Sequence, residues 1–182
     1  MSFLEWIAFV SGVAGVYLTV TQKTVSWIVE LLAIVITAWI YFEQHLLANT
    51  GLQVFYFVLS IYGWFSWRYD KAINHLIVLR LTYLQILLLL LGTAFQAVVY
   101  YYALIHFNGN NPLFDAILSA ASVTTTFMMA RKFIENWIAW IIIDLLYVVF
   151  NIQQNLILLA FLSFVFAIMA IFGYYSWKKV GK

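Results

Sequence analysis

Apolar residues run in seven segments separated by short polar interruptions, and this pattern predicts seven membrane-spanning helices. A helix needs about 20 mostly apolar residues to cross the hydrocarbon core of a bilayer. The segments cover residues 4–21, 25–43, 50–67, 79–103, 113–130, 134–152 and 156–177. Runs such as Ile86 to Leu91 do not alternate between apolar and polar positions, which argues against a transmembrane β-barrel. The expected fold is therefore an all-α integral membrane protein.

Distinctive residues recur without a gap after 110 positions. The matching pairs are Glu5 with Asp115, Trp27 with Trp137, Gly63 with Gly173, and Trp67 with Trp177. With one extra segment between the copies, counterparts are four crossings apart and point the same way through the bilayer, which defines a parallel repeat. We expect a 3+1+3 organisation, with a first three-helix bundle at 1–68, a linker containing the fourth helix at 69–110, and a second bundle at 111–182.

Composition supports a membrane protein and excludes several functions. Hydrophobic residues make up 66% of the chain and charged residues 9%, against about 25% charged residues in globular domains. The absence of cysteine excludes disulfides, thiol nucleophiles and iron–sulfur clusters. The sequence has no HExxH or GxSxG motif and no clustered histidines, so we expect no enzyme activity and no cofactor, and nothing predicts nucleic-acid binding. A retinal photoreceptor is excluded because the last segment contains no lysine.

The basic residues predict the orientation of the chain. All of them fall on the side of the predicted bundle that holds the C-terminus. They are Lys23, Arg68, Lys71, Arg80, Arg131, Lys132, Lys178, Lys179 and Lys182. Because Lys and Arg are enriched in cytoplasmic loops, we expect a cytoplasmic C-terminus and an N-terminus outside.

Polar and aromatic residues form narrow stripes on three of the predicted helices. At three- and four-residue steps they share one helical face. The sixth segment carries Trp137, Trp140, Asp144, Tyr147 and Asn151; the second carries Trp27 and Glu30; and the third carries Gln53 and Tyr56. Lipid tails offer no polar contacts, so we expect these stripes to face one another or a water-filled cavity.

Asp144 is the most informative single residue because it lies in the middle of a predicted helix. An ionised carboxylate there costs about 2.5 to 3.5 kcal/mol, and every Lys and Arg lies in a loop or at the end of a predicted helix. Indole rings stack on flat cations, so Asp144 beside Trp137 and Trp140 suits a planar cationic ligand. The alternative is an Asp that is neutral or hydrogen-bonded to neighbouring helices. Glu30 either joins this site or reaches the headgroup region.

Two further pairs have simpler structural interpretations. Trp67 and Trp177, at helix ends, are expected to be interface anchors, since tryptophan collects at bilayer interfaces. Gly63 and Gly173 are expected to permit close helix packing.

Four stretches together resemble the PnuC family of bacterial vitamin transporters over nearly the whole chain. They are Gly51-Leu-Gln-Val-Phe-Tyr, Ile61-Tyr-Gly-Trp-Phe-Ser-Trp67, Arg131-Lys-Phe-Ile-Glu-Asn-Trp-Ile-Ala-Trp140 and Gly173-Tyr-Tyr-Ser-Trp177. The resemblance implies two three-helix bundles joined by a linker helix, distantly similar to SWEET sugar transporters. It implies vitamin uptake across the bacterial inner membrane by facilitated diffusion, with trapping by a cytoplasmic kinase that phosphorylates the vitamin. It also implies a homotrimer as the candidate assembly.

One departure from the family pattern bears on the vitamin. Members that resemble the nicotinamide riboside carriers have Asn seven residues after the first Trp of the sixth-segment motif, where this chain has Asp144. We therefore favour thiamine, the substrate of the branch called PnuT, over nicotinamide riboside, which also carries a ring cation. In this hypothesis Trp137 and Trp140 stack on the vitamin rings and Asp144 offsets the thiazolium charge. Proton-coupled transport through Asp144 stays open as a different class of function.

The remaining polar residues of the stripes complete the hypothetical site. Gln53, Tyr56 and Asn151 would hydrogen-bond to the pyrimidine or hydroxyethyl groups, Glu30 would contribute from the opposite repeat, and Tyr147 shares the face of Asp144.

Overall fold

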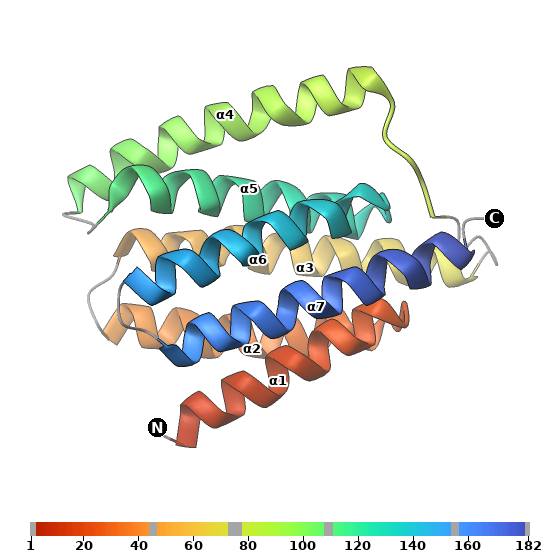
Figure 1. Cartoon of the computed structure of the whole chain (residues 1–182), viewed down its shortest axis with the longest axis horizontal. Helices are drawn as coiled ribbons and strands as arrows, with labels where there is room; N and C mark the ends of the chain where they lie inside the picture. Colours follow the sequence, from red (N-terminus) through yellow and green to blue (C-terminus); the bar gives the residue numbers. More distant parts are fainter. Residues whose placement is uncertain (1–2, 44–46, 73–77, 108–110, 154–156, 181–182) are drawn as a thin grey trace.

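Seven helices make up nearly all of the computed structural model, which describes residues 3–43, 47–72, 78–107, 111–153 and 157–180. They are α1 (Phe3–Val20), α2 (Val25–Glu43), α3 (Leu47–Ala72), α4 (Tyr83–His106), α5 (Pro112–Ala130), α6 (Glu135–Gln153) and α7 (Ile157–Val180). Successive helices run in opposite directions, so the two ends of the chain lie at opposite ends of the bundle (Figure 1). The predicted all-α fold with seven helices is confirmed.

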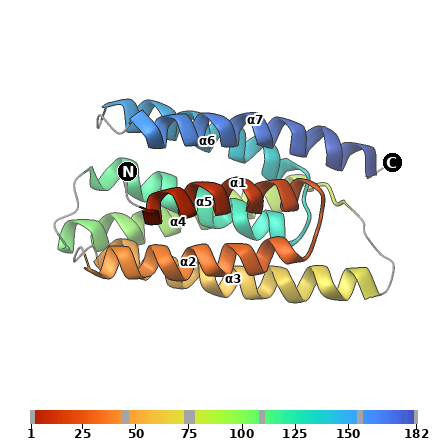
Figure 2. The same cartoon turned by 90° about the horizontal axis from the view of Figure 1, so that it is seen from below.

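Six of the helices form a closed ring. Each contacts the next in the order α1, α2, α3, α5, α6 and α7, and α7 contacts α1 again. In Figure 2, α6 and α7 lie on one side of the ring and α2 and α3 on the other. The fourth helix lies outside the ring against α5 (Figure 1), and Leu104 is the one buried residue among those described in it. The first repeat, α1 to α3, therefore meets the second repeat, α5 to α7, along two seams, α3/α5 and α1/α7.

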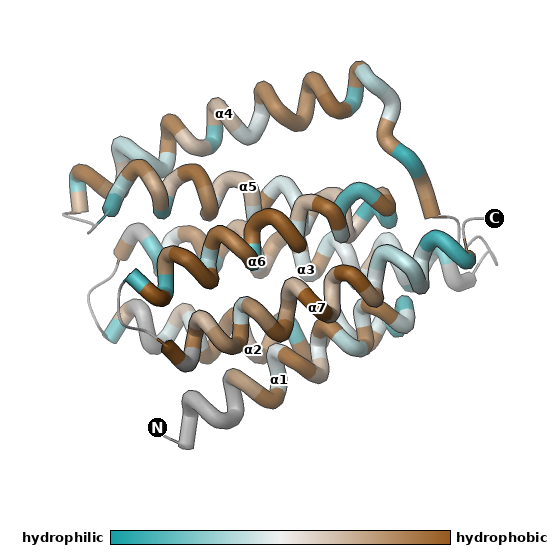
Figure 3. The backbone as a smooth tube through the Cα atoms, in the orientation of Figure 1, coloured by the Kyte–Doolittle hydropathy of each residue, from teal (hydrophilic) through white to brown (hydrophobic). Residues whose placement is uncertain are grey.

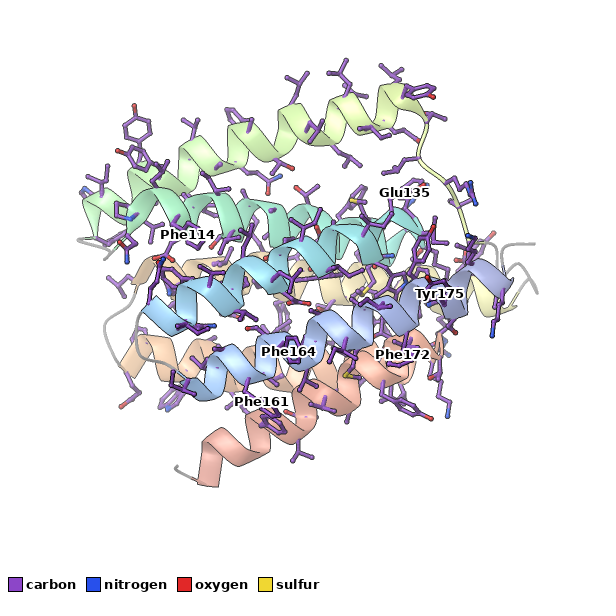
Figure 4. All side chains as sticks on the ribbon, viewed as in Figure 1. Phe114, Glu135, Phe161, Phe164, Phe172 and Tyr175 are labelled. Atoms are coloured by element: carbon purple, nitrogen blue, oxygen red, sulfur yellow. The ribbon has the colours of Figure 1, made fainter. Side chains whose placement is uncertain are left out.

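The outer surface of the bundle is apolar. Within the described ranges, four helices are long and apolar enough to cross a membrane: α4, α5, α6, and α7 from Leu159. The first two helices contribute shorter apolar stretches, Phe9–Val20 and Val25–Trp39. Aromatic side chains such as Phe161, Phe164 and Phe172 point away from the bundle along α7 and are exposed (Figure 4). Such a surface is stable in lipid, so the chain is a multi-pass membrane protein.

Hydrophilic residues concentrate at the helix ends and turns (Figure 3). The α1–α2 turn, the α5–α6 turn and the last residues of α3 and α7 all lie at the end that holds the C-terminus (Figure 1). These segments carry Lys23, Arg68, Arg131, Lys132, Lys178 and Lys179. We call this end of the bundle the basic end.

The two repeats fold alike in detail. In the α1–α2 turn the amide N of Gln22 donates to the carbonyl O of Thr19 at 2.9 Å, and in the α5–α6 turn Lys132 N donates to Met129 O at 2.9 Å. Gln22 and Lys132 both have left-handed backbones, with φ of 55° and 56°. A positive φ is uncommon outside glycine, so its recurrence at matching positions confirms the parallel repeat.

Gly63 and Gly173 permit a close contact that is also repeated. A Cβ atom at Gly63 would lie 2.5 Å from the Trp27 ring, and one at Gly173 would lie 2.5 Å from the Trp137 ring. Real Cβ atoms do not approach another heavy atom this closely, so only glycine leaves space for the indole. The predicted close helix packing at these two glycines is confirmed.

The prediction that Trp67 and Trp177 are interface anchors is wrong. Their exposed fractions are 1% and 0%, and their ring centroids lie 5.8 Å apart across the two repeats. Each also meets an indole of its own repeat edge-on, at 5.4 Å for Trp27–Trp67 and 5.3 Å for Trp137–Trp177. These rings belong to one buried hydrophobic cluster and fill the interior between the two repeats instead of reaching lipid. We call the four residues the indole cluster.

The fourth helix begins later than the predicted residue 79. Leu79 instead pairs with the α5–α6 turn, donating its amide to Lys132 O at 2.9 Å and accepting from Ile134 N at 3.0 Å. The helix starts after Thr82, whose side chain accepts from Gln85 N while the Gln85 side chain accepts from Thr82 N. This capping box satisfies two amides that the helix itself cannot, and it fixes the boundary.

Substituting Gly173→Ala is expected to destabilise the protein by about 1 to 3 kcal/mol, because the added methyl group overpacks the site of the Trp137 ring. The measurement is the midpoint of thermal unfolding in detergent, followed by tryptophan fluorescence. Gly92→Ala is the matched control, since a Cβ atom there has no described neighbour within 4 Å. Equal midpoints for the two variants would contradict the packing role of Gly173.

Candidate functional site

A cavity of about 240 Å³ lies inside the ring of helices. Its walls come from α1 and α2 of the first repeat and from α5, α6 and α7 of the second. Apart from indole nitrogens, its polar lining consists of Ser11, Thr19, Ser26, Glu30, Thr126 and Asp144. Among the residues that the structure describes, the lining contains two carboxyl groups and no Lys, Arg or His side chain. A cation is therefore the complementary guest for this cavity.

Asp144 lies on α6 with an exposed fraction of 6% and faces this cavity. Within the described residues it has no hydrogen-bond or ion-pair partner. An ionised carboxylate buried without a partner is costly. A carboxyl group in this position is stabilised either by a cation or by a proton.

Glu30 lines the same cavity from α2, across from Asp144. In the repeat, Glu30 corresponds to Trp140, whereas Asp144 corresponds to Ile34. Since α2 and α6 both start at the basic end, Asp144 lies about 6 Å farther from that end than Glu30, one helical turn at 1.5 Å per residue. The two acids therefore present charge at two heights on opposite walls, and Glu30 faces the cavity interior.

Two indoles from α6 contribute to the cavity beside Asp144. Trp137 and Trp140 both line it, and their Nε1 atoms are buried without an acceptor among the described residues. The hydroxyl of Ser26, also in the lining, is in the same state. Buried donors without an acceptor are unfavourable, so these three groups suit hydrogen-bond acceptors on a guest molecule.

Trp137 is also the link between the cavity and the indole cluster. It is 1% exposed, packs against Gly173 and meets Trp177 edge-on at 5.3 Å. Its ring is therefore fixed before any ligand arrives. A fixed aromatic wall reduces the ordering cost of binding.

The structure places the other four predicted site residues outside the cavity lining. Gln53 is buried on α3, and Tyr56 lies beside Ser122 and Tyr147, between α3 and the second repeat. The Asn151 amide donates to the Ser163 hydroxyl of α7 at 3.4 Å. The cavity lining thus includes Trp137, Trp140, Asp144 and Glu30 but not the other four residues. Of those four, Tyr56 lies close enough to Glu30 for an electrostatic interaction.

Sequence reasoning missed the contribution of α1. This helix lines the cavity with Ser11, Gly15 and Thr19, at four-residue steps on one face, together with Gly12. A Cβ atom at Gly12 would lie 3.1 Å from the Phe166 ring, so the glycine brings α1 close to α7. The stripe of small residues was the available signal, because small side chains mark close helix approach in membranes.

Comparison with known proteins identifies relatives of the chain. The family model described as nicotinamide mononucleotide transporter matches residues 2–179. The nicotinamide riboside transporter PnuC of Escherichia coli is 22% identical, over 97% of this chain and 85% of the relative. The riboflavin/roseoflavin transporter RibM of Streptomyces davaonensis is 25% identical, over 75% of this chain and 66% of the relative.

A solved structure has the same fold. The crystal structure of the vitamin B3 transporter PnuC superimposes with a TM-score of 0.77 and covers 99% of this chain and 82% of the solved chain, at 20% sequence identity. The resemblance extends over the whole bundle, including the linker helix.

Asp144→Asn is expected to stabilise the ligand-free protein by about 0.5 to 2 kcal/mol. It replaces a buried carboxyl group that has no partner among the described residues, and whose ionised form is costly, with a neutral amide of the same shape. The measurement is the thermal midpoint in detergent. Asp70→Asn is the control and should lower the midpoint, since Asp70 forms an ion pair with Lys132 at 3.2 Å. If both variants lower the midpoint equally, Asp144 has a structural partner and this interpretation fails.

Proposed function

The chain belongs to the nicotinamide mononucleotide transporter family, and from this premise we propose that it is a membrane carrier whose substrate is a cationic B vitamin, thiamine. The family consists of transporters, not enzymes, and the relatives named above carry B vitamins or their precursors. The observation that carries the proposal is the pairing of Asp144 with two indoles in a cavity whose described lining contains no basic side chain. A flat cation complements both features.

In the proposed complex, the thiazolium ring of thiamine lies against Trp137 and Trp140, with Asp144 offsetting its charge. Glu30 provides a second carboxylate from the opposite wall. Ser26 and the two indole N–H groups, which are buried donors without acceptors in the described part of the chain, pair with the aminopyrimidine nitrogens or the hydroxyethyl oxygen. Gln53, Tyr56, Tyr147 and Asn151 stay proposed contacts that require a rearrangement along the seams.

Nicotinamide riboside is the second candidate substrate, because several relatives are named for it and its pyridinium ring is also a flat cation. The acidic residue at position 144 favours thiamine in our proposal, since an amide suffices at that place in carriers similar to those for nicotinamide riboside. A side-by-side titration of thiamine, nicotinamide riboside and riboflavin ranks the three vitamins.

The proposed mechanism is alternating access by relative motion of the two repeats, 1–68 and 111–182, about the two seams. The basic end faces the cytoplasm of a bacterial inner membrane, as the positive-inside rule requires, and the N-terminus faces outward. Transport is facilitated diffusion, and a cytoplasmic kinase retains the vitamin by phosphorylation. A homotrimer is the proposed assembly. Coupling to protons through Asp144 is the competing mechanism.

Asp144→Asn is expected to weaken thiamine binding by about tenfold to a hundredfold at low ionic strength, because it removes the charge opposite the thiazolium. Isothermal titration in detergent measures the Kd. Asp115→Asn, which removes a carboxylate in the first turn of α5 away from the cavity, serves as the matched control. Undiminished affinity in Asp144→Asn would remove the electrostatic part of the proposal.

Liposomes without a pH or sodium gradient distinguish the two transport mechanisms. Facilitated diffusion predicts that labelled thiamine enters until its inner and outer concentrations are equal, with no accumulation. An imposed inward proton gradient should leave this end point unchanged. Accumulation driven by that gradient, and lost in Asp144→Asn, would instead establish proton coupling.

A further inference from the structure

Direct contacts join the two repeats at the basic end, between the cavity and that end of the bundle. On the α1/α7 seam, Trp177 Nε1 donates to Thr19 O and the Ser176 hydroxyl donates to Val20 O, each at 3.3 Å. On the α3/α5 seam, the Arg131 guanidinium donates to the Tyr62 hydroxyl at 3.1 Å. A molecule in the cavity can leave through the basic end only if these contacts and the indole cluster separate.

Lys132 makes the most unusual of the contacts between the repeats. It belongs to the α5–α6 turn of the second repeat and is 1% exposed. Its ammonium Nζ lies 3.2 Å from Asp70 Oδ2 and 5.2 Å above the centre of the Trp67 ring, and both partners lie on α3 of the first repeat. One buried cation thus connects the end of α3, the indole cluster and the second repeat.

The turn itself does not need this lysine. Its counterpart in the first repeat is Gln22, which has the same left-handed backbone and the same hydrogen bond to the preceding helix. The counterpart of Asp70 is Val180, whose apolar side chain cannot form an ion pair. Burying an ammonium is costly and often gives no net stability compared with neutral groups. A charge present in only one of two equivalent turns indicates a role beyond folding.

The free energies of burial and hydration allow the Lys132–Asp70 ion pair both to form and to separate. Burial lowers the pKa of the Lys132 ammonium, and the neighbouring Asp70 carboxylate opposes this shift. Asp70 keeps 31% of its side chain exposed, so water can replace the lysine as its partner when the pair separates. The ammonium then regains its own hydration, which lowers the barrier to opening relative to a purely apolar contact.

We propose that the Lys132–Asp70 ion pair, seated on Trp67, is a latch that holds the basic end closed, and that its release is a step in opening the cavity at that end. The proposal rests on the proposed carrier function only in assuming that a substrate passes through the basic end once it opens. The latch itself concerns access to the cavity and can be tested without any substrate.

The natural absence of cysteine makes the test direct. Ala33→Cys places one thiol in the cavity lining, and a membrane-impermeant maleimide measures its accessibility in membrane vesicles. Lys179→Cys, exposed at the basic end, reports which vesicle preparation presents that end to the reagent. The measured quantity is the labelling rate of the Ala33→Cys variant in the preparation that labels the Lys179→Cys variant.

Lys132→Met in the Ala33→Cys background is expected to raise this rate by about tenfold, the effect of losing one charge-assisted contact from a two-state element. Asp70→Asn should also raise the labelling rate. It replaces Lys132→Met in the test if that variant does not elute as a single monodisperse species. Gln22→Met, at the matching position of the first repeat, should leave the rate unchanged.

Equal labelling in the parent and both latch variants would overturn the proposal, and so would an equal increase in Gln22→Met, which would indicate general loosening of the bundle. Failure of thiamine binding alone leaves the labelling result intact. The two proposals therefore fail on different measurements.

Discussion

The rest of the bundle depends on the close packing at the basic end, where two glycines each accommodate an indole and four indoles pack together. Gly63 and Gly173 let Trp27 and Trp137 lie directly on the neighbouring helix, and Trp67 and Trp177 then meet between the repeats at 5.8 Å. The two repeats are thereby brought together at one end. The cavity begins where this packing ends, with Trp137 belonging to both.

The repeat places equivalent positions around the cavity but does not make its walls equivalent. Val16 and Thr126 are counterparts and both line it, as do Glu30 and Trp140. The acid of one repeat thus faces the indole of the other. The two carboxyl groups, Glu30 and Asp144, also lie one helical turn apart in depth, so the two walls of the cavity differ. The two repeats share one backbone fold, and a few residues that differ between them make the two sides of the cavity different.

Most of the fold could be predicted from the sequence, and the site only in part. Helix number and the parallel repeat follow from apolar runs and from the 110-residue offset, because lipid forces the chain into continuous helices. The pattern could not tell that Trp67 and Trp177 are buried, since a tryptophan at a helix end suits both the lipid interface and a protein interior. Nor could it separate Asn151, bonded to Ser163, from Asp144, because both share one helical face and differ only in depth.

Two buried charges of opposite sign lie near the indole cluster, and their separation explains why the acid in the cavity is left without a partner among the described residues. Lys132 is occupied by Asp70 and by the Trp67 ring, outside the cavity lining. Asp144 lies inside the cavity, beyond Trp137. If the lysine reached the carboxylate, the two groups would form an ion pair and neutralise each other. Because Lys132 packs on Trp67 whereas Asp144 lines the cavity beyond Trp137, rings of the indole cluster lie between the two groups.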